Sequence, residues 1–220
     1  RLRILTEPRR TELKKEMEME MQQSIEVRDR AAHLININYS NEHFQGFQDA
    51  DGFLGNILVP ATEFPRMEEF NLLLTQASSM NHEMAKVPAL STLANNINAF
   101  TNRTTPNGEV QNNFVPRAIN QLISASADLS NKGKAAVLTA VASKIELLNE
   151  QQPHLETVNH ILQTSQGIPD ANKSAVLSSL LSVMNGQLSA NSKSQIFGRI
   201  YDQAAGIPLA YKESLMPPLT

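Results

Sequence analysis

Hydrophobic positions in the second half of the chain recur at a fixed step of 39 residues. The segment Ala118 to Ile123 aligns with Thr157 to Leu162, and the same step leads to Ile196 to Tyr201. Further positions keep this register: Leu129, Ile168 and Ile207; Lys134, Lys173 and Lys212; Val137, Val176 and Leu215. A period of roughly 20–50 residues is typical of stacked helical units. The pattern therefore predicts an all-α fold, a helical-repeat (α-solenoid-like) stack with an irregular N-terminal helical cap.

Each 39-residue unit divides into two predicted helices, A and B, joined by a short turn. The expected ranges are about 115–127 and 155–166 for helix A, and about 132–149 and 171–186 for helix B. Asn131 and Asp170 stand where helix B starts, and both are good N-cap residues. Apolar residues follow helical spacing at Ile119, Leu122, Ile123, Val137, Leu138, Val141 and Ile145. Two helices cannot bury such a stripe alone, so we expect neighbouring units to cover one another.

The first half of the chain predicts helices with a less regular arrangement. These are expected at about 8–37, 67–84 and 88–100, with Pro88 opening the third. The buried face of the first is predicted from residues mostly four apart: Leu13, Met17, Met21, Ile25, Ala32 and Ile35. The other two are expected to bury Phe70, Leu73, Leu74 and Ala77, and Leu90, Leu93, Ala94 and Ile97. The chain is thus divided into 1–66, 67–113 and three repeats in 114–220, the last one truncated.

Two segments between the predicted helices lack helical periodicity. Residues 101–113 are polar and predict an exposed loop. Residues 38–66 combine closely spaced Asn, Gly and Pro with apolar side chains, among them Phe47, Phe53 and Leu54. Exposed, these side chains form a hydrophobic anchor for a partner. Buried, they close the first end of the stack.

Composition narrows the functional classes. Charged residues make up 19% of the chain and the net charge is −3, so the wide basic surface needed by nucleic acid is missing. The chain has no cysteine, which excludes thiolate catalysis, disulfides and Cys-based zinc sites. No apolar run approaches the roughly 20 residues of a membrane span. We expect a protein partner, with no nucleic acid and no membrane span.

The two ends of the sequence predict a piece of a longer protein. The chain opens at Arg1 without an initiator Met. The third unit reaches Pro217 and Pro218 about one turn into its helix B. We therefore expect further chain after this segment, or a C-terminus that docks elsewhere.

No pattern of side chains predicts a catalytic, cofactor or metal site. The five histidines form neither an H-E-x-x-H pair nor a zinc-finger spacing. A calcium loop starting at Asp49 would need a carboxylate ligand where Pro60 stands. The recurring Lys134, Lys173 and Lys212 predict a row of cations along one edge of the stack. This row either attracts an acidic segment of a partner or is a solvated position repeated by duplication.

The second unit, with Val158, Ile161, Ile168-Pro169 and Val176-Leu177, resembles HEAT/armadillo-like α-helical repeats. It is also similar to the helical repeats of exported bacterial (type III) effectors, which are commonly Cys-free, modular and rich in Ser and Asn. The resemblance covers about 115–216 and is one of pattern. It implies a protein-binding scaffold exported into a host cytoplasm, and it carries over no functional residue.

Three functions fit the sequence. The first is a protein–protein interaction scaffold of a bacterial virulence effector, which holds a host protein on a groove formed by successive helices. The second is a Cys-independent ubiquitin-ligase-type domain that recruits a conjugating enzyme through the apolar segment 44–59. The third is a structural spacer. Substitution of Phe53 or Leu54 separates the second function from the other two.

Overall fold

The computed structural model is built from α-helices. It describes residues 7–36, 64–100, 114–148, 151–183, 190–208 and 211. The helices in these ranges are α1 (Glu7–Asn36), α3 (Phe64–Ser79), α4 (Glu83–Asn95), α5 (Phe114–Ser126), α6 (Asn131–Ala142), α7 (Gln151–Thr164), α8 (Asp170–Val183) and α9 (Ala190–Ala205). Two short 3-10 helices, η2 (Ile97–Phe100) and η3 (Ile145–Leu147), follow α4 and α6. No strand occurs in the described ranges, so the predicted all-α class is confirmed.

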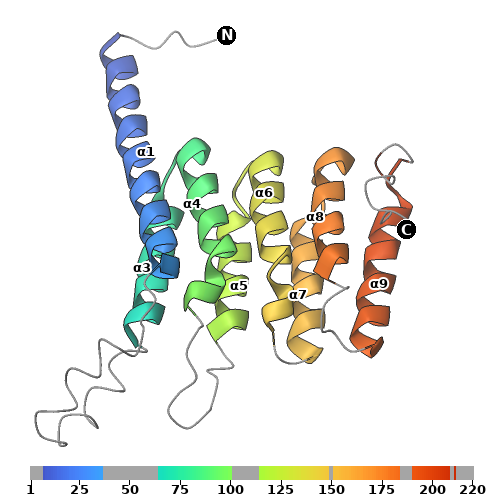
Figure 1. Ribbon diagram of the computed structural model, residues 1–220. Helices are drawn as coiled ribbons and strands as arrows, with labels where there is room; N and C mark the ends of the chain where they lie inside the picture. The colour runs from blue at the N-terminus through green and yellow to red at the C-terminus, as the bar shows by residue number, and fades with distance from the viewer. Residues whose placement is uncertain are drawn as a thin grey trace, which may run out of the picture.

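The helices pack in two rows (Figure 1). In the first row α1 contacts α4, α4 contacts α6, and α6 contacts α8. In the second row α3 contacts α5, α5 contacts α7, and α7 contacts α9. Contacts between α3 and α4, α5 and α6, and α8 and α9 join the two rows. Each helix therefore packs against helices one or two places away in the sequence. Helix α1 lies at one end of the described part and α9 at the other.

The core lies between the two rows and runs along the molecule. The seven apolar residues predicted from helical spacing in the first unit are all buried. The residues predicted for the two helices that follow the first one are buried as well: Phe70, Leu73, Leu74, Ala77, Leu90, Leu93, Ala94 and Ile97. The ring of Phe70 meets the rings of Phe100 and Phe114 edge-on, with centroids 5.1 and 5.3 Å away. This aromatic contact joins α3 to η2 and α5, and edge-to-face geometry is favourable for such rings.

Helix α1 confirms the predicted long N-terminal helix, and of its predicted stripe Leu13, Met17 and Met21 are partly buried, with Met21 packed against the core. The prediction placed Ile25 and Ala32 on the buried stripe, whereas both are exposed. The helix instead buries Ser24, Val27 and Ala31. A step of four residues rotates about 40° beyond a full helical turn, so a stripe drawn with that step drifts off the packed face. The true stripe follows 3.6 residues per turn.

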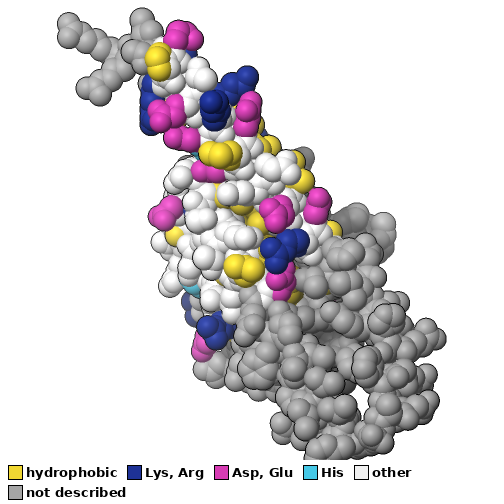
Figure 2. All heavy atoms as spheres, turned by 90° about the vertical axis from the view of Figure 1, so that its left-hand side faces the viewer, with side chains coloured by type: hydrophobic (Ala, Val, Ile, Leu, Met, Phe, Trp, Pro, Cys, Tyr) yellow, Lys and Arg dark blue, Asp and Glu magenta, His cyan; other side chains and the backbone are white. Residues whose placement is uncertain are grey.

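The N-terminal turns of α1 extend beyond the other helices (Figure 1). Figure 2 shows acidic and basic side chains intermixed around this part, with hydrophobic side chains scattered among them. Three ion pairs between residues three or four apart lie there: Arg9–Glu12, Arg10–Glu7 and Lys14–Glu18. Such exposed pairs add little to stability. The projecting turns therefore depend on local helix preference rather than on packing.

Several predicted helix starts and ends were wrong. Helix α4 begins at Glu83, so Pro88 lies inside it rather than at its start. The N-cap of α6 is Ser130, whose hydroxyl accepts from the Gly133 N–H at 3.3 Å, and Asn131 is the first helical residue. Asp170 likewise is the first residue of α8. Helix B of the first unit was expected to reach residue 149, but α6 ends at Ala142 and a separate 3-10 turn follows.

Gly133 lets α6 approach α4 closely. A Cβ atom at this position would lie 2.8 Å from Cγ2 of Val87 and 3.3 Å from Oε2 of Glu83. The first distance is too short for two carbon atoms, and the χ1 angle of Val is stiff. Glycine is therefore required here by helix–helix packing and not by its backbone angles.

We expect Gly133→Ala to lower the free energy of unfolding by about 1–3 kcal/mol, because overpacking outweighs the better helix propensity of Ala. Urea unfolding followed by circular dichroism measures the change. In a Val87→Ala background the same substitution is expected to cost less or to stabilise the protein. Equal costs in the two backgrounds would show that Val87 is not the obstacle.

Candidate functional site

Only part of the predicted binding surface lies in the described ranges. Phe47, Phe53, Leu54 and Lys212 lie outside them, so the apolar anchor and one end of the lysine row stay predictions. Lys134 and Lys173 are each the fourth residue of their helices, α6 and α8. These helices pack against each other, and both side chains are half-buried. Neither lysine forms an ion pair with a described carboxylate. Attraction of an acidic partner by these lysines remains a prediction.

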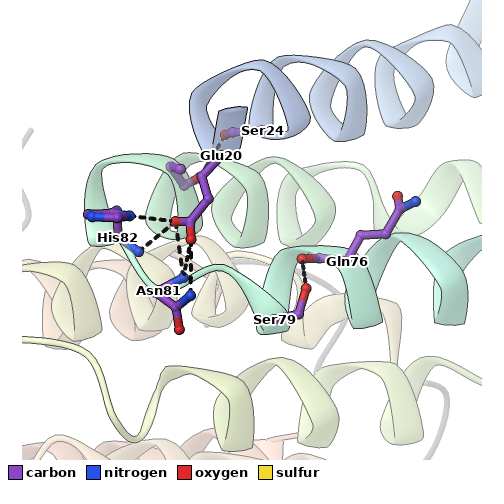
Figure 3. A network of polar contacts seen from close by, with 7 residues as sticks. Glu20, Ser24, Gln76, Ser79, Asn81 and His82 are labelled. Atoms are coloured by element: carbon purple, nitrogen blue, oxygen red, sulfur yellow. Dashed lines mark hydrogen bonds and ion pairs between the residues drawn. The ribbon is translucent and has the colours of Figure 1, made fainter. Parts of the chain in front are cut away.

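A carboxylate–imidazole contact between α1 and α4 is the first arrangement with possible chemistry (Figure 3). Oε2 of Glu20 lies 2.9 Å from Nδ1 of His82 and accepts from the His82 N–H at 2.7 Å. The Asn81 N–H donates to both carboxylate oxygens at 3.0 and 3.1 Å, and its side-chain amide donates at 3.1 Å. Every contact of the carboxylate in this network is therefore with residues that directly precede α4.

Glu20 acts as an N-terminal cap for α4, supplied by another helix. The first N–H groups of a helix have no partner within it, and a carboxylate at this end also interacts favourably with the helix dipole. Burial raises the pKa of Glu20, but the hydrogen bonds from His82 and Asn81 lower it by more, so this pKa lies below its ordinary value of 4.5. The geometry is that of a structural cap rather than of an acid–base pair facing a substrate.

The same kind of contact joins α4 to α6. The Glu83 carboxylate accepts from the hydroxyl of Ser130 at 2.6 Å and from its backbone N–H. The hydroxyl bond is the main cause of a lowered pKa of Glu83, the backbone bond adds to it, and burial opposes it. Two successive helices of the first row thus each provide a carboxylate to the start of the next one.

A second candidate is an exposed side of α9, which becomes visible when the three 39-residue units are compared. Three sets of equivalent positions are buried in every unit: Ala118, Thr157 and Ile196; Leu122, Ile161 and Ile200; Leu129, Ile168 and Ile207. Four further sets are buried in the first two units only: Val115, His154 and Lys193; Ile119, Val158 and Phe197; Ile123, Leu162 and Tyr201; Ser126, Ser165 and Ala204. The side of α9 formed by the exposed Phe197 and Tyr201, with the partly buried Ala204 at its edge, is called the α9 outer face below.

The α9 outer face carries two large aromatic side chains. Phe197 is 53% exposed and Tyr201 is 66% exposed. Their rings are stacked, with centroids 6.4 Å apart and planes inclined by 22°. Spacings of four and three residues place Phe197, Tyr201 and Ala204 on one side of the helix. This side of α9 therefore presents two adjacent aromatic rings, one of which carries the Tyr201 hydroxyl, and Lys193 lies one turn before Phe197.

The 39-residue step aligns Phe197 with Ile119 and Val158, but Phe197 is exposed where those two residues are buried. Ile196, Ile200 and Ile207 are buried like the residues 39 positions before them, and no pattern in the sequence predicted the α9 outer face as a site. One signal was available, because aromatic rings stand at 197 and 201 where the earlier copies carry Ile, Val or Leu. Both α5 and α7 are followed by further described helices in their row, and α9 is the last.

A shallow groove lies between α3 and α5 in the second row. It is lined by Leu74, Thr75, Ser78, Arg117, Asn120, Gln121, Ser124 and Ala125. Asn120 is already engaged, since its side-chain oxygen lies 3.0 Å from Nδ1 of His160 on α7.

Comparison with known proteins adds no family to this description. A scan of family models, a search of curated proteins and a search of solved structures each returned no match. The described helices contain no group of three or more His, Asp or Glu side chains placed to hold a metal ion. Within the same ranges, none of the helices has the length and apolarity that crossing a bilayer demands.

We expect Glu20→Gln to lower the free energy of unfolding at pH 7 by about 1–3 kcal/mol, since hydrogen bonds to a charged group are lost. The folded-state pKa is below the ordinary value, so this stabilisation is present above pH 4.5 and disappears as the pH falls through the folded pKa. Thermal unfolding at pH 7 and below pH 4 tests whether wild type and variant converge in acid. Glu18→Gln, an exposed site on the same helix, is the control. A difference that persists unchanged in acid would contradict the role of the charge.

We expect Ile119→Ala to lower the free energy of unfolding by about 2–5 kcal/mol, because it leaves a cavity in the core. Phe197→Ala, at the equivalent position of α9, is expected to cost less than about 1 kcal/mol because its ring is half in solvent. Urea denaturation of both variants measures the two costs. Similar costs would mean that the α9 outer face is covered by the chain itself in solution.

Proposed function

We propose that this chain is a protein-binding module, built as an α-solenoid-like stack of helix pairs, and that it binds its partner through the α9 outer face. The observation that carries the proposal is the exposure of Phe197 and Tyr201 at positions whose counterparts in α5 and α7 are buried. The two-row packing supports the stack, because each helix covers its neighbour in the row. The recurrence of three buried sets at the 39-residue step supports it further.

Physical chemistry favours burial of this face by a partner. Removing apolar surface from water contributes about 25 cal/mol per Å². Tyr and other aromatic residues are over-represented among the residues that dominate binding energy at interfaces. The two rings already stack on each other in the free chain. Less side-chain freedom is therefore lost on binding than for two independently moving rings.

The other surfaces of the described helices have fewer features of a protein-binding interface. The groove between α3 and α5 is open, and its Asn120 already pairs with His160. The projecting part of α1 presents intermixed charges, with only scattered hydrophobic side chains in Figure 2. Lys134 and Lys173 are half-buried and supply charge without an apolar centre. An interface needs such a centre for most of its energy.

No described residue favours the ubiquitin-ligase alternative. Its recruiting residues, Phe53 and Leu54, lie outside the described ranges. The spacer alternative makes a different prediction, that no surface substitution changes a binding property. Export as a bacterial effector stays a prediction from the sequence resemblance.

The test places a photo-crosslinking phenylalanine analogue at position 197 of the purified chain and, as a matched control, at Leu72. Leu72 is 47% exposed on α3, at the opposite end of the second row. We expect irradiation in cell lysate to give an adduct at position 197 that is absent at Leu72. Excess wild-type chain is expected to suppress this adduct, and excess Phe197→Ser/Tyr201→Ser double variant is not.

The crosslinked protein is then purified and its affinity is measured by calorimetry. The double variant is expected to bind at least tenfold more weakly, a change of about 1.4 kcal/mol or more. Leu72→Ser is expected to bind like wild type. Unchanged affinity of the double variant would show that the partner binds elsewhere than on α9. A complete lack of specific adducts at either position would favour the spacer.

A further inference from the structure

We propose that the groove between α3 and α5 is a second binding site, and that it takes an acidic peptide segment whose Asp or Glu carboxylate contacts Arg117. This site is separate from the α9 outer face, and neither surface needs the other. Three properties of the groove support it. The second row opens at this point, the lining supplies hydrogen-bond donors around one arginine, and no described carboxylate neutralises that arginine.

The groove exists because α3 does not follow the 39-residue step. The residue 39 positions before Asn120 is Asn81, which lies beyond the end of α3 at Ser79. Helix α3 therefore does not pack on α5 in the way that α5 packs on α7. The two helices meet edge-on at the rings of Phe70 and Phe114, near the start of α5, with centroids 5.3 Å apart. Beyond this contact they leave a groove of about 640 Å³, a size that suits a bound ligand.

The next pair of helices in the row shows how the chain closes the equivalent space. Nδ1 of His160 on α7 lies 3.0 Å from Oδ1 of Asn120 on α5. The residue of α5 that corresponds to His160 is Gln121, which lines the groove beside α3. Among the described residues the side-chain amide of Gln121 has no hydrogen-bond partner. A polar position that joins α7 to α5 is thus left available to a ligand between α5 and α3.

Arg117 is the cation of this groove. Arg9, Arg10 and Arg30 each form an ion pair with a glutamate, and within the described ranges Arg117 forms none. The groove lining contains neither Asp nor Glu. A guanidinium is a planar fork of N–H donors that matches the two oxygens of a carboxylate. A ligand carboxylate therefore supplies the charge that this part of the chain lacks.

Two side-chain amides next to Arg117 add donors. Asn120 and Gln121 follow it by three and four residues, so the three side chains are neighbours on one side of α5. The Asn120 oxygen accepts from His160, which leaves the amide nitrogen as a donor. One positive charge balances one carboxylate. A phosphate group carries about −1.5 to −2 and would keep an unbalanced negative charge here.

The other part of the lining is apolar and sets the spacing of the ligand. Leu74 is buried, and Ala125 is partly buried and packed against the core. The helical rise places Ala125 about 12 Å beyond Arg117 along α5. An extended peptide covers this length in about four residues. The bound segment therefore has an acidic residue three or four positions from a Val or Leu.

The experiment uses a short fluorescein-labelled Gly/Ser peptide with Glu-Ser-Gly-Leu at its centre. A second peptide carries Gln in place of Glu, a third carries phosphoserine there, and a fourth carries Lys. Fluorescence polarisation measures binding of each peptide to the intact 220-residue chain. Arg199→Gln is the matched control variant, because Arg199 is an exposed arginine of the same row and lies on α9.

We expect the Glu peptide to bind the wild-type chain, the Arg199→Gln chain and the Phe197→Ser/Tyr201→Ser chain alike. Its affinity is expected to fall about fivefold for Arg117→Gln, and the Gln peptide is expected to bind wild type equally weakly. Arg117→Glu is expected to reverse the preference and select the Lys peptide. Because Arg117 is exposed, the midpoint of thermal unfolding is expected to stay unchanged in both variants.

Equal binding of the Glu and Gln peptides, or no binding of the Glu peptide to wild type, would overturn the site. Tighter binding of the phosphoserine peptide would replace the carboxylate by a phosphate. Competition by free succinate as strong as by unlabelled peptide would replace the peptide by a small carboxylate. A fall of several degrees in the unfolding midpoint of Arg117→Gln would also overturn the site, because the guanidinium would then be engaged within the chain. Loss of the Glu peptide from the Phe197→Ser/Tyr201→Ser chain would contradict the separation of the two surfaces, whereas failure of the peptide alone leaves the proposed function at α9 intact.

Discussion

The structure depends on the burial of one helix's apolar side by the next helix in its row. A described helix pair isolated in water would expose Leu, Ile and Val side chains that the other described helices help to bury. Contact between α4 and α6, α6 and α8, or α5 and α7 removes these side chains from water. In α9, the last described helix of the second row, Phe197 and Tyr201 remain in solvent.

Polar contacts fix the relative positions of neighbouring helices. Burial of apolar side chains alone does not fix these positions. Glu20 fixes the start of α4 against α1, and Glu83 fixes the start of α6 against α4. The Ser24 hydroxyl donates to the Ala85 carbonyl at 2.6 Å, and the Ser179 hydroxyl donates to the Thr139 carbonyl at 2.9 Å. Directional bonds of this kind discriminate between registers, whereas apolar contact tolerates sliding.

The two ends of the described helical stack differ in their packing. At the first end α1 packs on α3 and α4, and a salt bridge of 2.5 Å joins Arg30 to Glu69. At the other end the replacement of aliphatic residues by Phe197 and Tyr201 enlarges the apolar surface that α9 leaves in solvent. A position that is structural in α5 and α7 thus becomes a candidate binding position in α9. The third copy differs from the first two in these side chains and in having no described helix after it in its row.

The sequence by itself determined that the chain is helical, where most helices lie, and which side chains of the 39-residue step are apolar enough to be buried. Helical periodicity is a local property, so Ile119, Leu122 and Val137 could be assigned to the core from their spacing. Tertiary structure alone decided the start of α4, because its capping carboxylate comes from Glu20, more than 60 residues earlier in the chain. It alone decided that Phe197 is exposed while Ile119 is buried. Spacing states which side of a helix a residue occupies, and only the neighbouring helices determine whether that side meets protein or water.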